Sequence, residues 1–298
     1  MINSENIPSC GCRLLDMHDV VQGATLPLAL LYPARGDEHA AHFGPYTLDV
    51  AMDAPPCGAR HPLLVISHGN SGTPWAYREL AKHLVRAGFV VALPAHTGNT
   101  RHDNSLAGTA ANLANRPRHI SLTIDTVLAD AVLKDHVAPY GVALIGHSIG
   151  GYTALAVAGG QPWSSPAESP DGQLRPVPVQ QDQRVAALVL LNPAAFWFVP
   201  ESLRAVRVPI LIRTGAKDEI TPIEHAHKII NGVADASLVE HKDVAGGGHF
   251  AFMSKFPPEM TRPNFKPSQD PPGFDRESIQ PELFADVTSF LKRTLCAV

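Results

Sequence analysis

The sequence lacks the features that would anchor it in a membrane or tie it together with disulfides. No apolar run reaches the roughly 20 residues that a membrane-spanning helix needs. The N-terminal stretch has neither the basic nor the apolar region of a secretory signal. Only 4 of the 298 residues are cysteines, too few for a disulfide framework in a chain of this size. We therefore expect a cytoplasmic protein with free thiols.

A strong charge of either sign is also absent. Charged residues make up 17% of the chain and the formal net charge at pH 7 is -4, which favours neither nucleic acid nor an anionic membrane as a partner. Two histidine-containing stretches, His96–Asp103 and His225–His227, lack the spacing of a zinc motif. We place the first at the rim of the candidate site and the second on a surface helix, and we expect no metal and no other cofactor. Nothing in the sequence indicates the oligomeric state.

From residue 62 onward, apolar runs of strand length alternate with helical patterns. The chain is 45% hydrophobic and long enough for one large α/β domain. Strands are predicted at 62–67, 89–93, 141–146, 185–191, 208–213 and 237–241. Helices are predicted at 75–86, 117–133, 152–157, 223–230 and 281–295. This alternation implies a mostly parallel sheet with helices on both faces.

Three segments fall outside this alternation. Residues 1–53 are typical of a β-rich lead-in, and residues 95–115 of a long polar loop. Residues 161–184 are rich in Pro, Ser, Gln and Asp, and form either a lid or a surface loop without function. Because no repeat and no clear linker divides the chain, we expect a single domain over 1–298.

One short stretch organises the rest of the chain. Gly146-His-Ser148-Ile-Gly150 matches Gly-x-Ser-x-Gly, with an apolar run before it and a helical run after it. In such a strand–turn–helix the serine lies on a sharp turn at the sheet edge, and the glycines leave room for the strained backbone. Many unrelated chains match this pattern, so its meaning depends on the residues that could act with it.

The chain offers an acid and a histidine in the order that such a serine requires. A serine hydroxyl needs a base, and the base needs an orienting acid; on this turn they follow in the order serine, acid, histidine. We predict Ser148 as the nucleophile, Asp218 as the orienting acid and His249 as the general base and then acid. Glu219 is the main alternative for the acid, and Asp243 is a weaker one.

A tetrahedral intermediate also needs backbone donors for its oxyanion. The N–H of Ile149, directly after the nucleophile, is expected to supply one. The loop His68-Gly-Asn-Ser-Gly72 follows the first buried strand, so the Asn70 N–H is the natural second donor.

Substrate is expected at loops that follow the carboxyl ends of the strands. The candidate contact residues are His147, Trp75, Trp197 and Phe250. For Trp75 and Phe250, packing in the core is an equally good interpretation. Within Phe196-Trp197-Phe198 we expect at least one side chain in the core, because alternate residues point in opposite directions.

Several stretches together resemble a known family. They are 65–72, 89–99, 115–121, 146–151, 248–252 and 272–276. On these motifs the chain resembles the α/β-hydrolase-fold carboxylesterases, and more narrowly the dienelactone-hydrolase-like group related to platelet-activating-factor acetylhydrolase. The resemblance implies hydrolysis of small esters by Ser148, Asp218 and His249. Dienelactone hydrolase proper uses a cysteine nucleophile, so its lactone substrate is not carried over, and a cysteine found after the histidine in many members is missing from 253–258.

The leading interpretation is a metal-free serine carboxylesterase that hydrolyses small-molecule esters through an acyl-enzyme. A lipase, a phospholipase A2-like acetylhydrolase, a thioesterase or a peptidase would use the same triad, although the polar segment 161–184 does not resemble a broad apolar lipase lid. A non-catalytic receptor on this fold often lacks a triad member, and none is missing here. A dehalogenase would need a carboxylate in place of Ser148.

Overall fold

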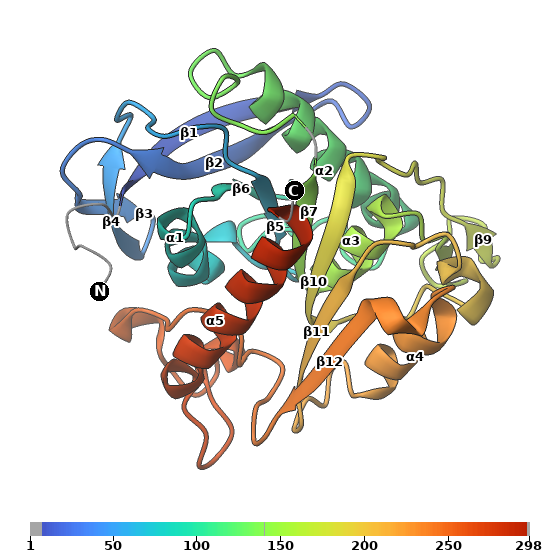
Figure 1. Cartoon of the computed structure of the whole chain (residues 1–298). Coiled ribbons are helices and arrows are strands. Elements are labelled where there is room, and N and C mark those ends of the chain that lie inside the picture. The colour runs from blue at the N-terminus through green and yellow to red at the C-terminus, as the bar shows by residue number, and fades with distance from the viewer. Residues whose placement is uncertain (1–7, 140, 297–298) are drawn as a thin grey trace.

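A ten-stranded sheet runs through the molecule (Figure 1). The computed structural model describes residues 8–139 and 141–296. The strand order is β12-β11-β10-β7-β5-β6-β2-β1-β4-β3, and the strands from β12 to β6 are parallel. Their bounds are β1 (Ser9–Asp19), β2 (Ala24–Ala34), β3 (His39–Phe43), β4 (Tyr46–Met52), β5 (Leu63–Ser67), β6 (Val90–Pro94), β7 (Val142–Ser148), β10 (Val185–Pro193), β11 (Ile210–Gly215) and β12 (Val239–Val244).

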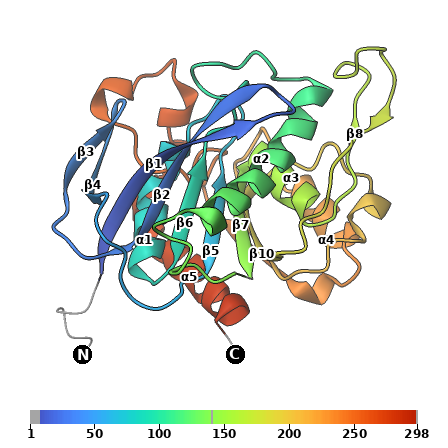
Figure 2. The same ribbon diagram turned by 90° about the horizontal axis from the view of Figure 1, so that it is seen from above.

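Helices cover both faces of the parallel part (Figures 1 and 2). α1 and α5 pack on one face, while α2, α3 and α4 pack on the other. The helices are α1 (Arg78–Arg86), α2 (Ala110–Ala129), α3 (Ile149–Val157), α4 (Glu224–Gly232) and α5 (Arg276–Leu295). Short 3-10 turns occur at Pro74–Tyr77, Pro200–Leu203, Ala236–Leu238, Pro258–Met260 and Lys266–Ser268. The predicted mostly parallel sheet with helices on both faces is confirmed.

Alternate side chains along the parallel strands point to opposite faces of the sheet and pack into two separate apolar layers. In β5, Leu63 and Val65 face α2 and α3, whereas Leu64 and Ile66 face α1 and α5. All four side chains are fully buried, and burying one such side chain stabilises the fold by about 1.5–3 kcal/mol. The strands that precede the candidate site are therefore held from both sides.

The helix α2 begins before Pro117, the residue at which the sequence placed its start. Thr109 caps it by accepting a backbone N–H with its hydroxyl, so the polar loop ends there and not at residue 115. A proline inside a helix leaves the carbonyl four residues earlier without its usual donor. Here the Tyr152 hydroxyl donates to that carbonyl, of Leu113, over 3.0 Å. A tertiary contact therefore compensates the helix for its proline.

Two other predicted boundaries also move. The last helix begins at Arg276, where Asp275 caps it, so Pro281 lies inside the helix and not at its start. The last strand, predicted at 237–241, is shifted toward the C-terminus because a 3-10 turn precedes it. Both shifts leave the order of the elements unchanged.

The lead-in is part of the main sheet, whereas the segment 161–184 forms a small sheet of its own. The lead-in forms β1 to β4, and β2 joins it antiparallel to β6. The segment 161–184 carries a small hairpin of β8 (Trp163–Ser164) and β9 (Arg175–Pro176), which projects beyond α2 and α3 (Figure 2). Among the described helices, none is both long enough and apolar enough to cross a membrane.

Candidate active site

The turn between β7 and α3 holds Ser148 in a strained backbone conformation. Its φ of 56° and ψ of -123° lie in a region that costs a non-glycine residue about 1–3 kcal/mol. Two glycines make the turn possible, because a Cβ at Gly146 would overlap the Gly150 carbonyl, and one at Gly150 would overlap the Ser67 carbonyl. The serine is thus presented at the carboxyl edge of the sheet, as the motif predicts.

Asp218 and His249 meet at this same edge, in the loops after β11 and β12. The His249 Nδ1–H donates to Asp218 Oδ2 over 2.8 Å, and both side chains are buried. Burial alone would raise the pKa of Asp218, but the hydrogen bonds from His249 and Thr221 hold it below its usual value. A charged carboxylate on Nδ1 leaves the imidazole Nε2 able to accept a proton.

Two backbone N–H groups also hydrogen-bond to the Asp218 carboxylate. Asp218 Oδ1 accepts the N–H groups of Ile220 and Thr221 at 2.8 and 2.9 Å. The alternative acids are placed differently: Glu219 is exposed, and Asp243 lies on β12, where it accepts the Thr214 hydroxyl. Of the three candidate acids, only Asp218 is hydrogen-bonded to the His249 ring.

An asparagine that sequence reasoning did not select holds the two loops together. Asn192, at the end of β10, donates its amide to the carbonyls of Gly248 and His249 at 3.1 and 3.0 Å. Its Oδ1 accepts the Gly215 N–H at 2.7 Å, and its own φ is 44°. The only sequence signal was an asparagine directly after a buried strand. Asn192 therefore positions the histidine loop relative to the strand that leads to the acid.

The imidazole of His147 lies inside the fold, which corrects the predicted substrate contact. The Tyr77 hydroxyl donates to its Nδ1, and its Nε2–H donates to the His249 carbonyl, both over 2.8 Å. This direction follows because a carbonyl can only accept. Burial, reinforced by the nearby His249, lowers the pKa of His147 to about 3. His147 thus joins the residue before Ser148 to the histidine loop as a neutral ring.

The two expected oxyanion donors lie in the loop after β5 and at the start of α3. Ile149 is the first residue of α3, and Asn70 lies in the exposed part of the loop after β5. A Cβ built on Gly69 would stand 3.4 Å from the Ser148 Cβ, so this loop passes directly beside the nucleophile turn. Within the described residues, neither the Asn70 nor the Ile149 N–H donates to a protein acceptor. Both are therefore free for an oxyanion.

Two of the predicted substrate contacts border cavities. Trp197 donates its Nε1–H to Glu168 over 2.8 Å and packs edge-on against Tyr152. It borders a cavity of about 540 Å³ with four largely exposed apolar side chains, Trp163, Leu174, Phe196 and Val199. Trp75 stacks on Phe43 with ring centroids 3.8 Å apart and borders a second cavity, of about 450 Å³, beside the lead-in.

The remaining aromatic predictions divide between site and core. The half-buried Phe250 stands edge-on to the His249 ring with centroids 5.1 Å apart, and it also packs against the core. Phe198 is buried, so the expectation of a core side chain in 196–198 is confirmed, whereas Phe196 is 57% exposed.

One histidine of each stretch is buried where the sequence suggested a surface, whereas His102 and His227 are exposed. His225 is buried and its Nδ1 accepts the Ala195 N–H at 3.0 Å, so the predicted surface position is wrong for this residue. His96 is also fully buried, in a network behind the Asn70 loop. No group of three or more His, Cys, Asp or Glu side chains in the described part of the chain is arranged to hold a metal ion.

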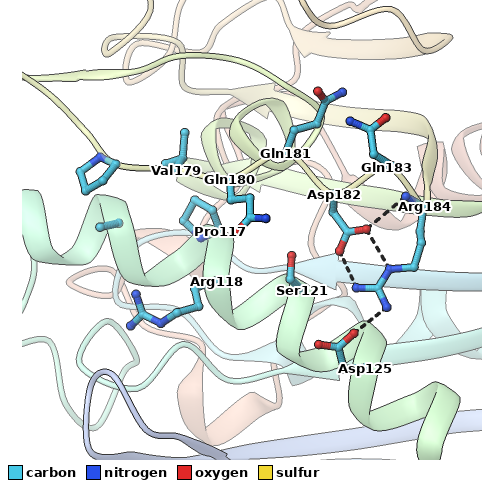
Figure 3. Close-up of a pocket in the computed structure, with 12 residues that line it drawn as sticks. Pro117, Arg118, Ser121, Asp125, Val179, Gln180, Gln181, Asp182, Gln183 and Arg184 are labelled. Carbon is cyan, nitrogen blue, oxygen red and sulfur yellow. Dashed lines mark hydrogen bonds and ion pairs between the residues drawn. The ribbon is translucent and has the colours of Figure 1, made fainter.

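A cavity of about 610 Å³ lies between α2 and the segment 178–184 (Figure 3). The guanidinium of Arg184 points at Asp182 and Asp125, which compensate its charge. Arg118, on the α2 side of the cavity, is paired with Asp19 at 2.6 Å. None of the predicted site residues lines this cavity.

Comparisons with known proteins agree with this architecture. A family profile described as "Alpha/beta hydrolase family" matches residues 63–193, less than half of the chain. No curated protein sequence matches. Among solved structures, the chain is similar to a ferulic acid esterase from Streptomyces cinnamoneus, with 19% sequence identity and a TM-score of 0.76, over 99% of this chain and 92% of that one. The chain has the α/β-hydrolase fold.

Proposed function

We propose that the protein is a serine carboxylesterase that hydrolyses small carboxylic esters through an acyl-enzyme. The observation that carries this proposal is the 2.8 Å hydrogen bond from His249 to Asp218 at the sheet edge where the strained turn presents Ser148. The motifs quoted above also support the narrower resemblance to the dienelactone-hydrolase-like and platelet-activating-factor-acetylhydrolase-like group, with serine in place of cysteine.

The mechanism follows from these positions. His249 Nε2 takes the Ser148 proton as the hydroxyl oxygen attacks the ester carbonyl, and Asp218 stabilises the imidazolium. The N–H groups of Asn70 and Ile149 receive the oxyanion. His249 then returns the proton to the leaving alcohol, and a water molecule activated by the same imidazole releases the acid.

The aromatic cavity beside Trp197 favours esters that carry a compact apolar or aromatic group. Its lining is mostly apolar, and two of its lining residues, Phe196 and Trp197, follow closely in the chain after Ala194, whose N–H donates to the Ser148 carbonyl over 2.9 Å. The similar structure is named as a ferulic acid esterase, an activity on an aromatic acid ester. A panel of p-nitrophenyl and methyl esters of varied acyl size tests this assignment. We expect kcat/KM to rise with an aromatic or branched acyl group, and a steady rise with straight-chain length would instead favour a lipase.

Replacement of the nucleophile is the direct test of the reaction. We expect Ser148→Ala to lower kcat for p-nitrophenyl acetate by a factor of about 10⁴ or more while the circular dichroism spectrum stays unchanged. Ser278→Ala, at an exposed serine near the start of α5, is the matched control and should keep full activity. Turnover that survives in folded Ser148→Ala would reject the assignment.

A further inference from the structure

Behind the Asn70 loop lies a fully buried arginine whose contacts are all to neutral groups. Arg116, on α2, is 0% exposed. Its guanidinium donates to the Thr153 hydroxyl at 3.0 Å, to Asn99 Oδ1 at 2.7 Å, and to the Ser67 hydroxyl and the His68 carbonyl. Burial lowers the pKa of Arg116 to about 9, so the group remains charged at pH 7. Within the described residues, its hydrogen-bond acceptors are hydroxyl, amide and carbonyl oxygens, and none of the ion pairs involves it.

Two of these contacts lead to the two oxyanion donors. Asn99, which accepts from Arg116, donates its own amide to Asn70 Oδ1 over 2.6 Å. Thr153, which also accepts from Arg116, donates its hydroxyl to the Ile149 carbonyl over 3.0 Å. One guanidinium is therefore linked through a single side chain to each of the two residues whose N–H groups are the expected oxyanion donors.

The guanidinium also holds the start of the Asn70 loop directly. It donates to the carbonyl of His68, which precedes Gly69 and Asn70. The His68 ring is itself fixed, because Nδ1 donates to the Gly69 carbonyl at 2.8 Å and Nε2 accepts the His96 N–H at 3.1 Å. Burial and the Arg116 charge lower the pKa of His68 to about 3, so the ring is neutral.

A chain of neutral rings leads away from the arginine on its other side. The Ser67 hydroxyl donates to His96 Nε2, and His96 Nδ1–H donates to His119 Nδ1. His119 passes the last hydrogen to Gln22 Oε1 over 2.8 Å. The direction of these hydrogen bonds follows because the Gln22 Oε1 can only accept. Each group in the chain therefore accepts on its Arg116 side and donates on the far side. The chain solvates the positive charge without neutralising it.

Other arginines that lie near this region are arranged differently. Arg118 is paired with Asp19, and Arg184 with Asp182 and Asp125. A buried ion without a partner costs several kcal/mol after relaxation, so hydrogen bonding alone does not account for a charged side chain at 116. A tetrahedral intermediate, however, places a negative charge on the substrate oxygen beside this loop, and a buried cation without a counter-ion favours that charge.

We propose that Arg116 is a positioning residue for the oxyanion hole. Its guanidinium holds Asn70 and Ile149 in place and supplies a positive charge that complements the oxyanion. This role rests on the proposed esterase function. Its effect falls on the transition state, so kcat should change far more than KM. Loss of one direct oxyanion donor typically lowers kcat by about 10²–10³. Since Arg116 acts through Asn99 and Thr153, we expect Arg116→Met to lower kcat by about 10².

The experiment compares wild type, Ser148→Ala, Arg116→Met and Arg116→Lys with p-nitrophenyl acetate, together with inhibition by a trifluoromethyl ketone, which forms an oxyanion on the serine. Arg118→Met, which removes a partly exposed, paired arginine two positions along α2, is the matched control. We expect Arg116→Met to weaken ketone binding by the same factor as kcat/KM, with KM within about twofold. Arg116→Lys keeps a charge but not the fork of donors, and should lose about tenfold in kcat. Arg118→Met should match the wild type.

The outcomes separate the two proposals. An active wild type with an inactive Ser148→Ala establishes the esterase; an unchanged kcat in folded Arg116→Met then overturns only the role of Arg116. A change in KM alone, or a loss of kcat with unaltered ketone binding, overturns it as well. If Arg116→Met does not fold, Arg116→Lys decides: wild-type kcat and ketone affinity overturn the role, and parallel losses support it. A wild type with no esterase activity and no reaction with the ketone overturns both proposals.

Discussion

The two halves of the candidate site each bury one charge, and they differ in how that charge is held. In the acid–base half, Asp218 is bonded directly to the ring of His249 at 2.8 Å. In the oxyanion half, Arg116 reaches Asn70 and Ile149 only through intervening side chains. In our proposal, each charge gains its full complement only during the reaction, when His249 becomes an imidazolium and the ester oxygen becomes an oxyanion.

This difference in directness sets the order of the expected effects. In the proposed mechanism Asp218 is hydrogen-bonded to the imidazole that transfers the proton, so its loss acts directly on proton transfer. Arg116 touches the neighbours of the donors, so its loss allows the donors to shift and removes a more distant charge. The proposal therefore expects the acid–base half to be the more sensitive of the two.

The largest effect should follow from neutralising the acid. We expect Asp218→Asn to lower kcat by a factor of about 10⁴, because an amide at this position favours the wrong tautomer of His249. Glu219→Gln is the matched control at the next, exposed residue and should stay within about twofold. Steady-state hydrolysis of p-nitrophenyl acetate measures both. The reverse order of the two variants would move the acid to Glu219.

A smaller effect, on stability, should follow from the buried neutral rings of both halves, His68 and His119 in the oxyanion half and His147 in the acid–base half. Burial lowers the pKa of His68 and His119 from 6.5 to about 3, and the Arg116 charge adds to the shift, although Asp19 opposes it at His119. Above pH 6.5 these rings are neutral in both the folded and the unfolded chain, so they do not lower the free energy of unfolding. As the pH falls from 6.5 toward 3, the unfolded chain binds protons that the folded chain rejects, so the free energy of unfolding falls. Each ring contributes up to about 1.4 kcal/mol per pH unit in this range.

Urea denaturation at pH 7.5, 6.5, 5.5 and 4.5 measures this slope. Asp218, whose pKa lies below 3.8 in the fold, loses its stabilising contribution only below this range, so the histidines are separated from it. His119→Gln keeps a hydrogen-bonding side chain in the chain to Gln22 and should make the slope shallower. A free energy of unfolding that stays constant between pH 7.5 and 4.5 would show that these rings accept protons without cost.

The acid–base half was easier to predict from the sequence than the oxyanion half, for a physical reason. The nucleophile, acid and histidine follow β7, β11 and β12, so their order along the chain matches the order of these strands in the sheet. The geometry around Asp218 and His249 agrees with that prediction. Asn192 was missed because one asparagine after a strand has no distinguishing pattern.

The network around Arg116 could not be predicted, because it depends on contacts distant in sequence. Pro117 is typical of a helix start, and this placed Arg116 outside the predicted helix. The helix in fact passes through the proline because Tyr152 donates to the Leu113 carbonyl. The inward position of His147 and His225 has a similar origin, since the residue type alone does not show which ring nitrogens find buried partners.

The most direct test of the central claim is the intact mass of the protein after treatment with a fluorophosphonate, followed by peptide mapping. The proposal predicts one phosphonyl group per chain, on Ser148, with esterase activity lost in proportion, and no modification of Ser148→Ala. A folded, active protein that keeps its unmodified mass, or one modified elsewhere while it loses activity, would contradict the assignment of Ser148 as the nucleophile.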